Sequence, residues 1–210
     1  MRRSMLWLGA LLGALVTTSG LASAYTFDDL EIEYWTGSGQ NEAVVIIDWK
    51  FATPGIESKA FGYRWGGAKT IKEMIEDIAA DPRLYAEWTG PGLGAVNAYG
   101  WDASGNGVFE ETDPADWFHR GFGLGIPPMW WQHFKSDTND GENWTADELE
   151  APANEPLPNG HWDAWVWTEM ANPQPPDIPI KPEIIPEPVT FLLVGLGVAA
   201  LSRRLRKGFS

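Results

Sequence analysis

The residues best suited to chemistry lie in a short loop that is rich in oxygen-bearing side chains. Counted from Asp102 as position 1, oxygen donors lie at positions 1, 3, 5, 7 and 12 of the loop. Gly107 lies at position 6, where a sharp turn is needed. The donors are the side chains of Asp102, Ser104, Asn106 and Asp113 and the carbonyl of Val108. This spacing of oxygen ligands is the one with which a twelve-residue loop wraps Ca²⁺. The sequence therefore predicts a loop that binds calcium and uses it to stabilise the domain.

The same loop also fits an ordinary hairpin connection. Ser104 stands where a calcium loop usually has an acidic residue, and Asp113 stands where the bidentate glutamate is usual. The preceding residues, 98–101, predict a strand instead of an entering helix. Glycine and asparagine are frequent in such turns for conformational reasons alone. Both interpretations stay open at this point.

Tryptophan is the second candidate for ligand binding, because twelve of the thirteen tryptophans lie beyond residue 24. An indole ring offers a broad apolar face beside a polar N–H, which suits stacking on sugars or other planar ligands. Trp130 and Trp131 follow Pro127-Pro128 in a loop-like context, and the pair is predicted to form an exposed platform for a glycan. The tryptophans within the predicted strands fit core packing instead.

Catalysis is not indicated by any motif. His119, His133 and His161 lack the spacing of a metal-binding helix, and the chain has no nucleophile elbow, phosphate loop or dinucleotide fingerprint. Carboxylates are so numerous that a glycosidase-like pair is always available, so such a pair carries no weight. We therefore expect a protein that is not an enzyme, with a hydrolase as the most distant alternative.

The charge of the chain limits its partners. Between the two terminal segments lie 29 acidic and nine basic residues, a net charge of about −20. This excess repels the phosphates of nucleic acids and anionic lipids, and it suits divalent cations or neutral ligands. Cysteine is absent, so disulfides do not stabilise the domain.

The strands and helices that must position these residues can be predicted from the sequence, and together they indicate an α+β domain at 25–171. Hydrophobic runs bounded by turn residues predict strands, and an apolar stripe at helical spacing after Thr70 predicts one main helix. The expected strands are 43–49, 60–65, 94–101 and 161–167, and the expected helices are 71–80 and a short one within 113–120. This order favours a mostly antiparallel sheet covered by the helix, either β-grasp-like or a β-sandwich with an inserted helix.

Both ends of the chain predict membrane targeting. Residues 1–24 have a basic start, an apolar run and a small-residue cleavage site, Ala22-Ser23-Ala24, which is typical of a signal peptide whose helix is removed on export. A buried N-terminal helix is the alternative. Near the other end, 172–188 is proline-rich and predicts an extended linker between the domain and the membrane.

The last segments follow that linker in a fixed order. Pro186-Glu187-Pro188 is followed by an apolar stretch at 189–202, which predicts a transmembrane helix, and by a basic tail at 203–210. The cations of the tail are Arg203, Arg204, Arg206 and Lys207. Basic residues stay in the cytoplasm, so the folded domain is expected outside. An ordinary tail anchor is the alternative.

This tripartite tail resembles the PEP-CTERM sorting signal of Gram-negative bacteria. The resemblance implies export by the Sec machinery, transient anchoring in the inner membrane, processing by an exosortase, and delivery to the cell surface or beyond. The region before the tail is similar to an uncharacterised domain of such surface proteins, on short segments that include 62–65 and 162–165. We expect an exported, noncatalytic surface or matrix-associated protein, with a carbohydrate or planar-ligand binding module as the alternative.

Overall fold

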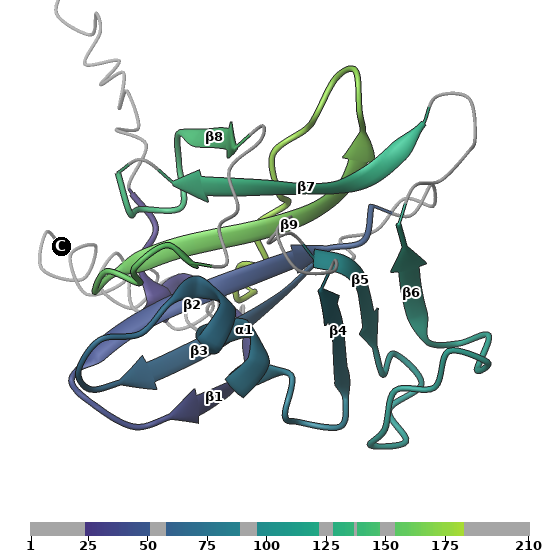
Figure 1. The fold of residues 1–210 in the computed structure, drawn as a ribbon, viewed down its shortest axis with the longest axis horizontal. Coiled ribbons are helices and arrows are strands. Elements are labelled where there is room, and N and C mark those ends of the chain that lie inside the picture. The colour runs from purple at the N-terminus through teal and green to yellow at the C-terminus, as the bar shows by residue number, and fades with distance from the viewer. Residues whose placement is uncertain are drawn as a thin grey trace, which may run out of the picture.

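The computed structural model describes residues 24–50, 58–88, 96–121, 128–136, 138–147 and 154–182. These residues form two β-sheets and one α-helix (Figure 1), which confirms the α+β class. Most of the predicted signal peptide, the predicted sorting motif, the predicted transmembrane helix and the basic tail lie outside the described residues. Within the described residues, no helix is long and apolar enough to cross a bilayer.

The larger sheet has six strands. They are β1 (Ile32–Gly37), β2 (Asn41–Asp48), β3 (Ser58–Trp65), β7 (Met129–Ser136), β8 (Trp144–Asp147) and β9 (His161–Glu169). Their order across the sheet is β1-β3-β2-β9-β7-β8, so the last strand of the chain, β9, lies in the middle. The sheet is mixed, because β1 runs parallel to β3 and β2 parallel to β9, whereas its other three pairings are antiparallel.

The smaller sheet is antiparallel and has the order β4-β5-β6. Its strands are β4 (Leu84–Trp88), β5 (Val96–Trp101) and β6 (Trp117–Arg120). The prediction of a short helix within 113–120 is wrong. Asp113 caps a turn by accepting a hydrogen bond from the Ala115 amide at 2.9 Å, and the residues that follow pair with β5.

Helix α1 (Ile71–Ile78) confirms the main predicted helix. Thr70 and Glu73 form a reciprocal capping box, which satisfies amides that a helix start leaves without partners. The apolar stripe of the helix is buried, and it consists of Ile71, Met74, Ile75 and Ile78. A turn at Asp81-Pro82 follows and leads into β4.

The six-stranded sheet is covered on both faces. On one face, α1 and the smaller sheet enclose a core that includes Val45, Phe61, Trp49 and Trp165. On the other face, Val44, Ile46 and Trp162 pack beneath Leu30 and other residues from the two ends of the domain. Alternate residues of the central strands therefore belong to two separate cores, as the period of a strand requires.

The two ends of the domain form the cover of that second face. The N-terminal segment, with the 3-10 helix Phe27–Asp29, lies beside the proline-rich segment. Leu30 bridges to Ile180, the Glu31 amide donates to the Pro179 carbonyl at 2.8 Å, and the Lys181 amide donates to the Asp29 carbonyl at 2.9 Å. The first part of the predicted linker is thus packed on the domain, and the packed part extends past the expected boundary at 171 to Pro182.

Candidate functional site

The predicted calcium loop is organised around the carboxylate of Asp102. This side chain is buried and accepts hydrogen bonds from the amides of Gly105, Asn106 and Gly107 at 2.7, 3.1 and 2.6 Å. The Ser104 hydroxyl donates to it as well, at 3.0 Å. Burial alone would raise the pKa of Asp102, but these four donors lower it overall. Asp102 is therefore an anion that holds the loop closed from inside.

A second carboxylate, Asp116, closes the loop from its far end. It accepts hydrogen bonds from the amides of Ser104 at 3.0 Å and Glu110 at 2.8 Å. Phe109 fixes the middle of the loop, because its ring lies against Gly100 and stacks on both Tyr85 and Phe118, with ring centroids 5.6 Å apart in each pair. The hydrogen bonds of Asp116 and the ring contacts of Phe109 thus hold the loop in place beside the smaller sheet.

The predicted calcium ligands are directed at the loop itself. Asn106 accepts a hydrogen bond from the Val108 amide at 2.9 Å, and Asp113 caps its own turn, while Asp102 is occupied as described. The part of the chain that the structure describes contains no group of three or more His, Asp or Glu arranged to hold a metal ion. Calcium binding by this loop stays a prediction of the sequence.

The predicted tryptophan platform is divided between the core and the surface. Trp131 is only 7% exposed and belongs to the first core, where its indole N–H donates to the His119 carbonyl at 3.0 Å. Trp130, its neighbour on the opposite face of β7, is half-buried. The pair does not present two adjacent rings to solvent, because successive residues of a strand point to opposite faces.

His119 provides a test of this packing by pH. It stacks on Trp167 with ring centroids 4.5 Å apart, and burial lowers its pKa from 6.5 to about 4. The unfolded chain then binds more protons than the folded chain between these values, so stability falls as the pH is lowered from about 6.5 to about 4. Chemical denaturation should show a loss of about 2 kcal/mol, allowing for partial exposure. His119→Phe keeps an aromatic ring at this position but has no group that titrates. If this variant loses as much stability over the same pH range, His119 is not the group responsible.

A buried ionic cluster that the sequence did not reveal lies across β7 and β9. Asp163 is fully buried and contacts the Nε2 atom of His133, with His161 Nε2 at 3.7 Å from the same oxygen. Burial by itself raises the pKa of Asp163, but the two imidazoles outweigh it and lower the pKa to about 2. Because all three residues are at most 7% exposed, the cluster belongs to the interior.

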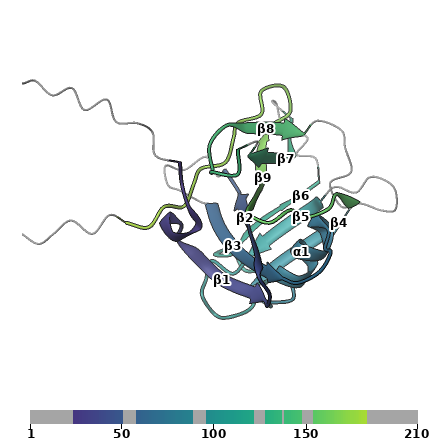
Figure 2. The ribbon, with the colours of Figure 1, turned by 90° about the vertical axis from the view of Figure 1, so that its left-hand side faces the viewer.

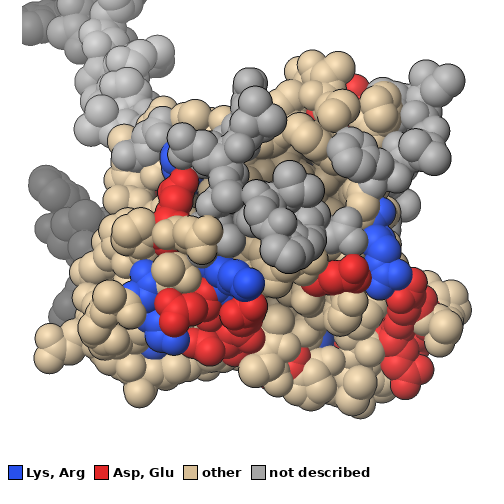
Figure 3. Space-filling view, viewed as in Figure 1, with Lys and Arg blue, Asp and Glu red and all other residues tan. Residues whose placement is uncertain are grey.

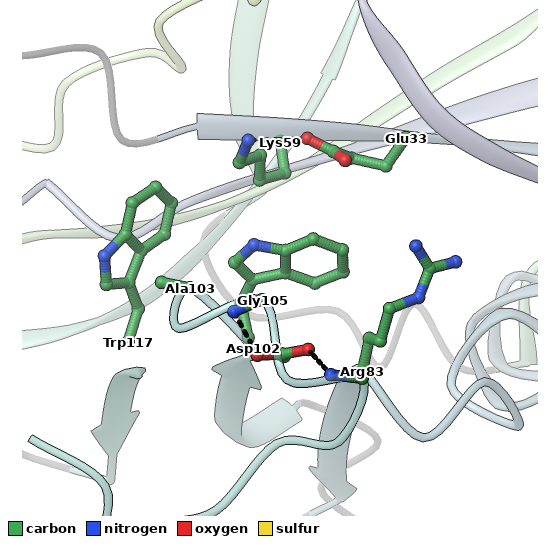
Figure 4. Close-up of a pocket in the computed structure, with 9 residues that line it drawn as sticks. Glu33, Lys59, Arg83, Asp102, Ala103, Gly105 and Trp117 are labelled. Carbon is green, nitrogen blue, oxygen red and sulfur yellow. Dashed lines mark hydrogen bonds and ion pairs between the residues drawn. The ribbon is translucent and has the colours of Figure 1, made fainter. Parts of the chain in front are cut away.

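A pocket of about 360 Å³ lies between the two sheets. Trp101 ends β5 and Trp117 begins β6, and the two are directly opposite each other in the register. Side chains at such positions lie on the same face of a sheet, so the two indoles form one side of the pocket. Lys59 of β3 and Glu33 of β1 lie on the other side, across from the Asp102 loop (Figure 4).

The charged groups of this pocket are paired. Lys59 Nζ lies 2.5 Å from Glu33 Oε1 and 5.7 Å from the centre of the Trp117 ring. The Arg83 guanidinium lies 4.7 Å from the centre of the Tyr34 ring and binds both oxygens of Asp81, each at 2.9 Å. This ion pair raises the pKa of the Arg83 guanidinium. The pocket therefore combines an aromatic wall with ion pairs that leave little net charge.

Comparison with protein-family models, with curated proteins and with solved structures finds no match to this chain. The site is therefore defined by its own geometry. Of its residues, the sequence analysis singled out Asp102 and Gly107, both in the predicted calcium loop. Trp101 and Trp117 could have been found from the expected strand up to residue 101 if residues 117–120 had been assigned as its antiparallel partner. Lys59 and Glu33 are distant in sequence and carry no local signal.

Proposed function

We propose that this chain is an exported, noncatalytic surface or matrix-associated protein, sorted by its PEP-CTERM-like tail. The observation that supports the proposal is the side-by-side pairing of the two ends of the domain. The bridge between Leu30 and Ile180, with its flanking hydrogen bonds, holds residues 29–31, shortly after the predicted signal peptide, beside residues 179–181, shortly before the predicted sorting motif.

This arrangement suits a domain that is held at a membrane by either end. Both terminal segments cover the same face of the six-stranded sheet, whereas α1 and the smaller sheet cover the opposite face (Figure 2). Charged side chains of both signs gather over the α1 side of the molecule (Figure 3), with Lys69, Lys72, Glu73, Glu76 and Asp77 in ion pairs there. A chain anchored through its tail would turn that charged side outward.

The remaining features of the proposal follow from the tail and the packing. Export by the Sec machinery removes residues 1–24, an exosortase acts near Pro186-Glu187-Pro188, and the domain is released to the surface or the extracellular matrix. Calcium at the 102–113 loop is an additional stabiliser in this proposal. Of the two expected architectures, a β-sandwich with an inserted helix is favoured, because two sheets enclose the first core together with α1.

Mass spectrometry of cell fractions tests the proposal. We expect the wild-type protein to begin near Tyr25, to have lost its tail near residue 188, and to leave the inner membrane. Glu187→Ala should leave an uncut tail and a membrane-bound chain, because the central carboxylate of the sorting motif is gone. Glu183→Ala, which removes a carboxylate four residues earlier, should be processed normally. An uncut, full-length wild-type chain in the cytosol would refute the proposal.

A further inference from the structure

We propose that the pocket formed by Trp117, Trp101, Lys59 and Glu33 binds a neutral sugar ring. The site is distinct from the Trp130-Trp131 pair, and its ligand binding does not depend on the sorting tail. Its volume of about 360 Å³ is at the lower end of the range for small-ligand sites and suits one ring or a terminal sugar of a glycan.

The aromatic wall provides the face on which a sugar ring can stack. Trp117 is half-buried, so part of its ring reaches the pocket, whereas Trp101 is 5% exposed and forms the floor. Trp117 is held in place by Trp49, whose ring centroid is 5.6 Å away. A preordered indole binds the apolar face of a ring without a large loss of side-chain entropy.

The polar side of the pocket, formed by Lys59 and Glu33, provides hydrogen-bond donors and acceptors for the ligand. The side chains of Lys59 and Glu33 are 28% and 22% exposed, and their single contact at 2.5 Å uses one ammonium hydrogen and one carboxylate oxygen. An ammonium has three donors and a carboxylate several acceptor positions, so both retain capacity. A hydroxyl donates and accepts at once, and a pair of neighbouring hydroxyls can therefore contact both groups.

The charges of the site argue for a neutral ligand. Lys59 is balanced by Glu33, Arg83 by Asp81, and the Asp102 carboxylate is saturated by loop donors. A charged ligand would lose hydration without gaining an uncompensated partner. The loop leaves room for the ligand, because at Gly105 and Gly107 no atom beyond the glycine and its chain neighbours lies within 4 Å of the position that a Cβ would take.

Isothermal titration of the full-length chain tests this site, in a detergent without a sugar headgroup. The probes are glucose, galactose and N-acetylglucosamine, with glucuronate as an anionic and adenine as a planar comparison. We expect saturable binding of at least one neutral sugar, with a Kd on the order of 1 mM for a single ring. Trp117→Ala should weaken binding about tenfold or more, because such aromatic anchors dominate binding energy.

Two further variants make the result decisive. Lys59→Met keeps the length of the side chain and removes its donors, so it should weaken sugar binding about as much as Trp117→Ala does. This variant keeps the test decisive if Trp117→Ala fails to fold. Trp144→Ala removes a half-buried tryptophan on β8, away from the pocket, and should leave the affinity unchanged within about twofold. Absence of saturable binding, tighter binding of glucuronate or adenine, or an equal loss in the Trp144 variant would overturn the proposal.

Discussion

A chain that ends after Ala171 is expected to lose its cooperative unfolding transition or to be destabilised by at least about 4 kcal/mol, relative to a chain that ends after Pro182. The eleven residues removed include Ile178, which packs on the second core, and the buried Pro176 and Pro179. Their loss also removes the amide of Asp177, which donates to the buried carboxylate of Asp48 at 2.8 Å. Circular dichroism during urea unfolding measures the difference.

The chain that ends after Pro182 is the matched control, because it lacks the same tail but keeps the packed segment. It should unfold at the same urea concentration as a chain that ends after Pro188. Equal midpoints for the two truncated chains would show that residues 172–182 are a spacer after all, as the proline content alone suggests.

Trp49→Ala is expected to cost about 3 to 5 kcal/mol, the range for removing a large aromatic side chain from a core. Trp49 is fully buried, its indole N–H donates to the Tyr99 carbonyl at 3.2 Å, and its ring contacts Trp117 and Trp131. It follows the end of β2 and reaches across to the smaller sheet. Its loss therefore loosens the contact between the two sheets, and urea titration at neutral pH measures the cost.

Trp49→Phe distinguishes packing from hydrogen bonding at this position. Phenylalanine keeps most of the apolar contact and loses the donor, so a cost of about 1 kcal/mol is expected from the hydrogen bond, with a smaller term from lost volume. If Trp49→Ala costs no more than Trp49→Phe, the ring does not hold the sheets together.

The elements that the sequence predicted are those whose signal is local. In β2, the run from Ala43 to Ile47 is apolar on both faces, and the structure buries both faces. Helix α1 has its cap, its stripe and its stop signal within a dozen residues. Such elements can be predicted without knowing which elements they pack against, because their hydrophobic pattern and their local secondary-structure propensity agree.

The missed elements depend on distant partners. Residues 117–120 form β6 because β5 offers an antiparallel edge there, and this pairing overrides the helix-start signal of Asp113-Pro114. β7 contains Gln132 and His133 in its buried middle, so its hydrophobic pattern is interrupted. The partner of His133 is Asp163, thirty residues away, which no local pattern reveals.

The candidate site was predicted only in its loop. Asp102, which the sequence predicted as a calcium ligand, lines the pocket, and its carboxylate accepts hydrogen bonds from the amides of its own loop. The pocket beside it is assembled from β1, β3, β5 and β6, whose order in space follows from the sheet pairing. The packing of the first part of the proline-rich segment was not predicted, because prolines fix an extended backbone both in a free linker and in a packed one.

The central place of β9 determines when the larger sheet can be completed. β2 can pair with β9 only after more than a hundred intervening residues have been made, and β7 also waits for that strand. Contacts so distant in sequence form late, because a large loop must be closed first. The larger sheet can therefore be completed only after His161–Glu169 has been synthesised, and under the proposed export it would be completed only after this strand has been translocated.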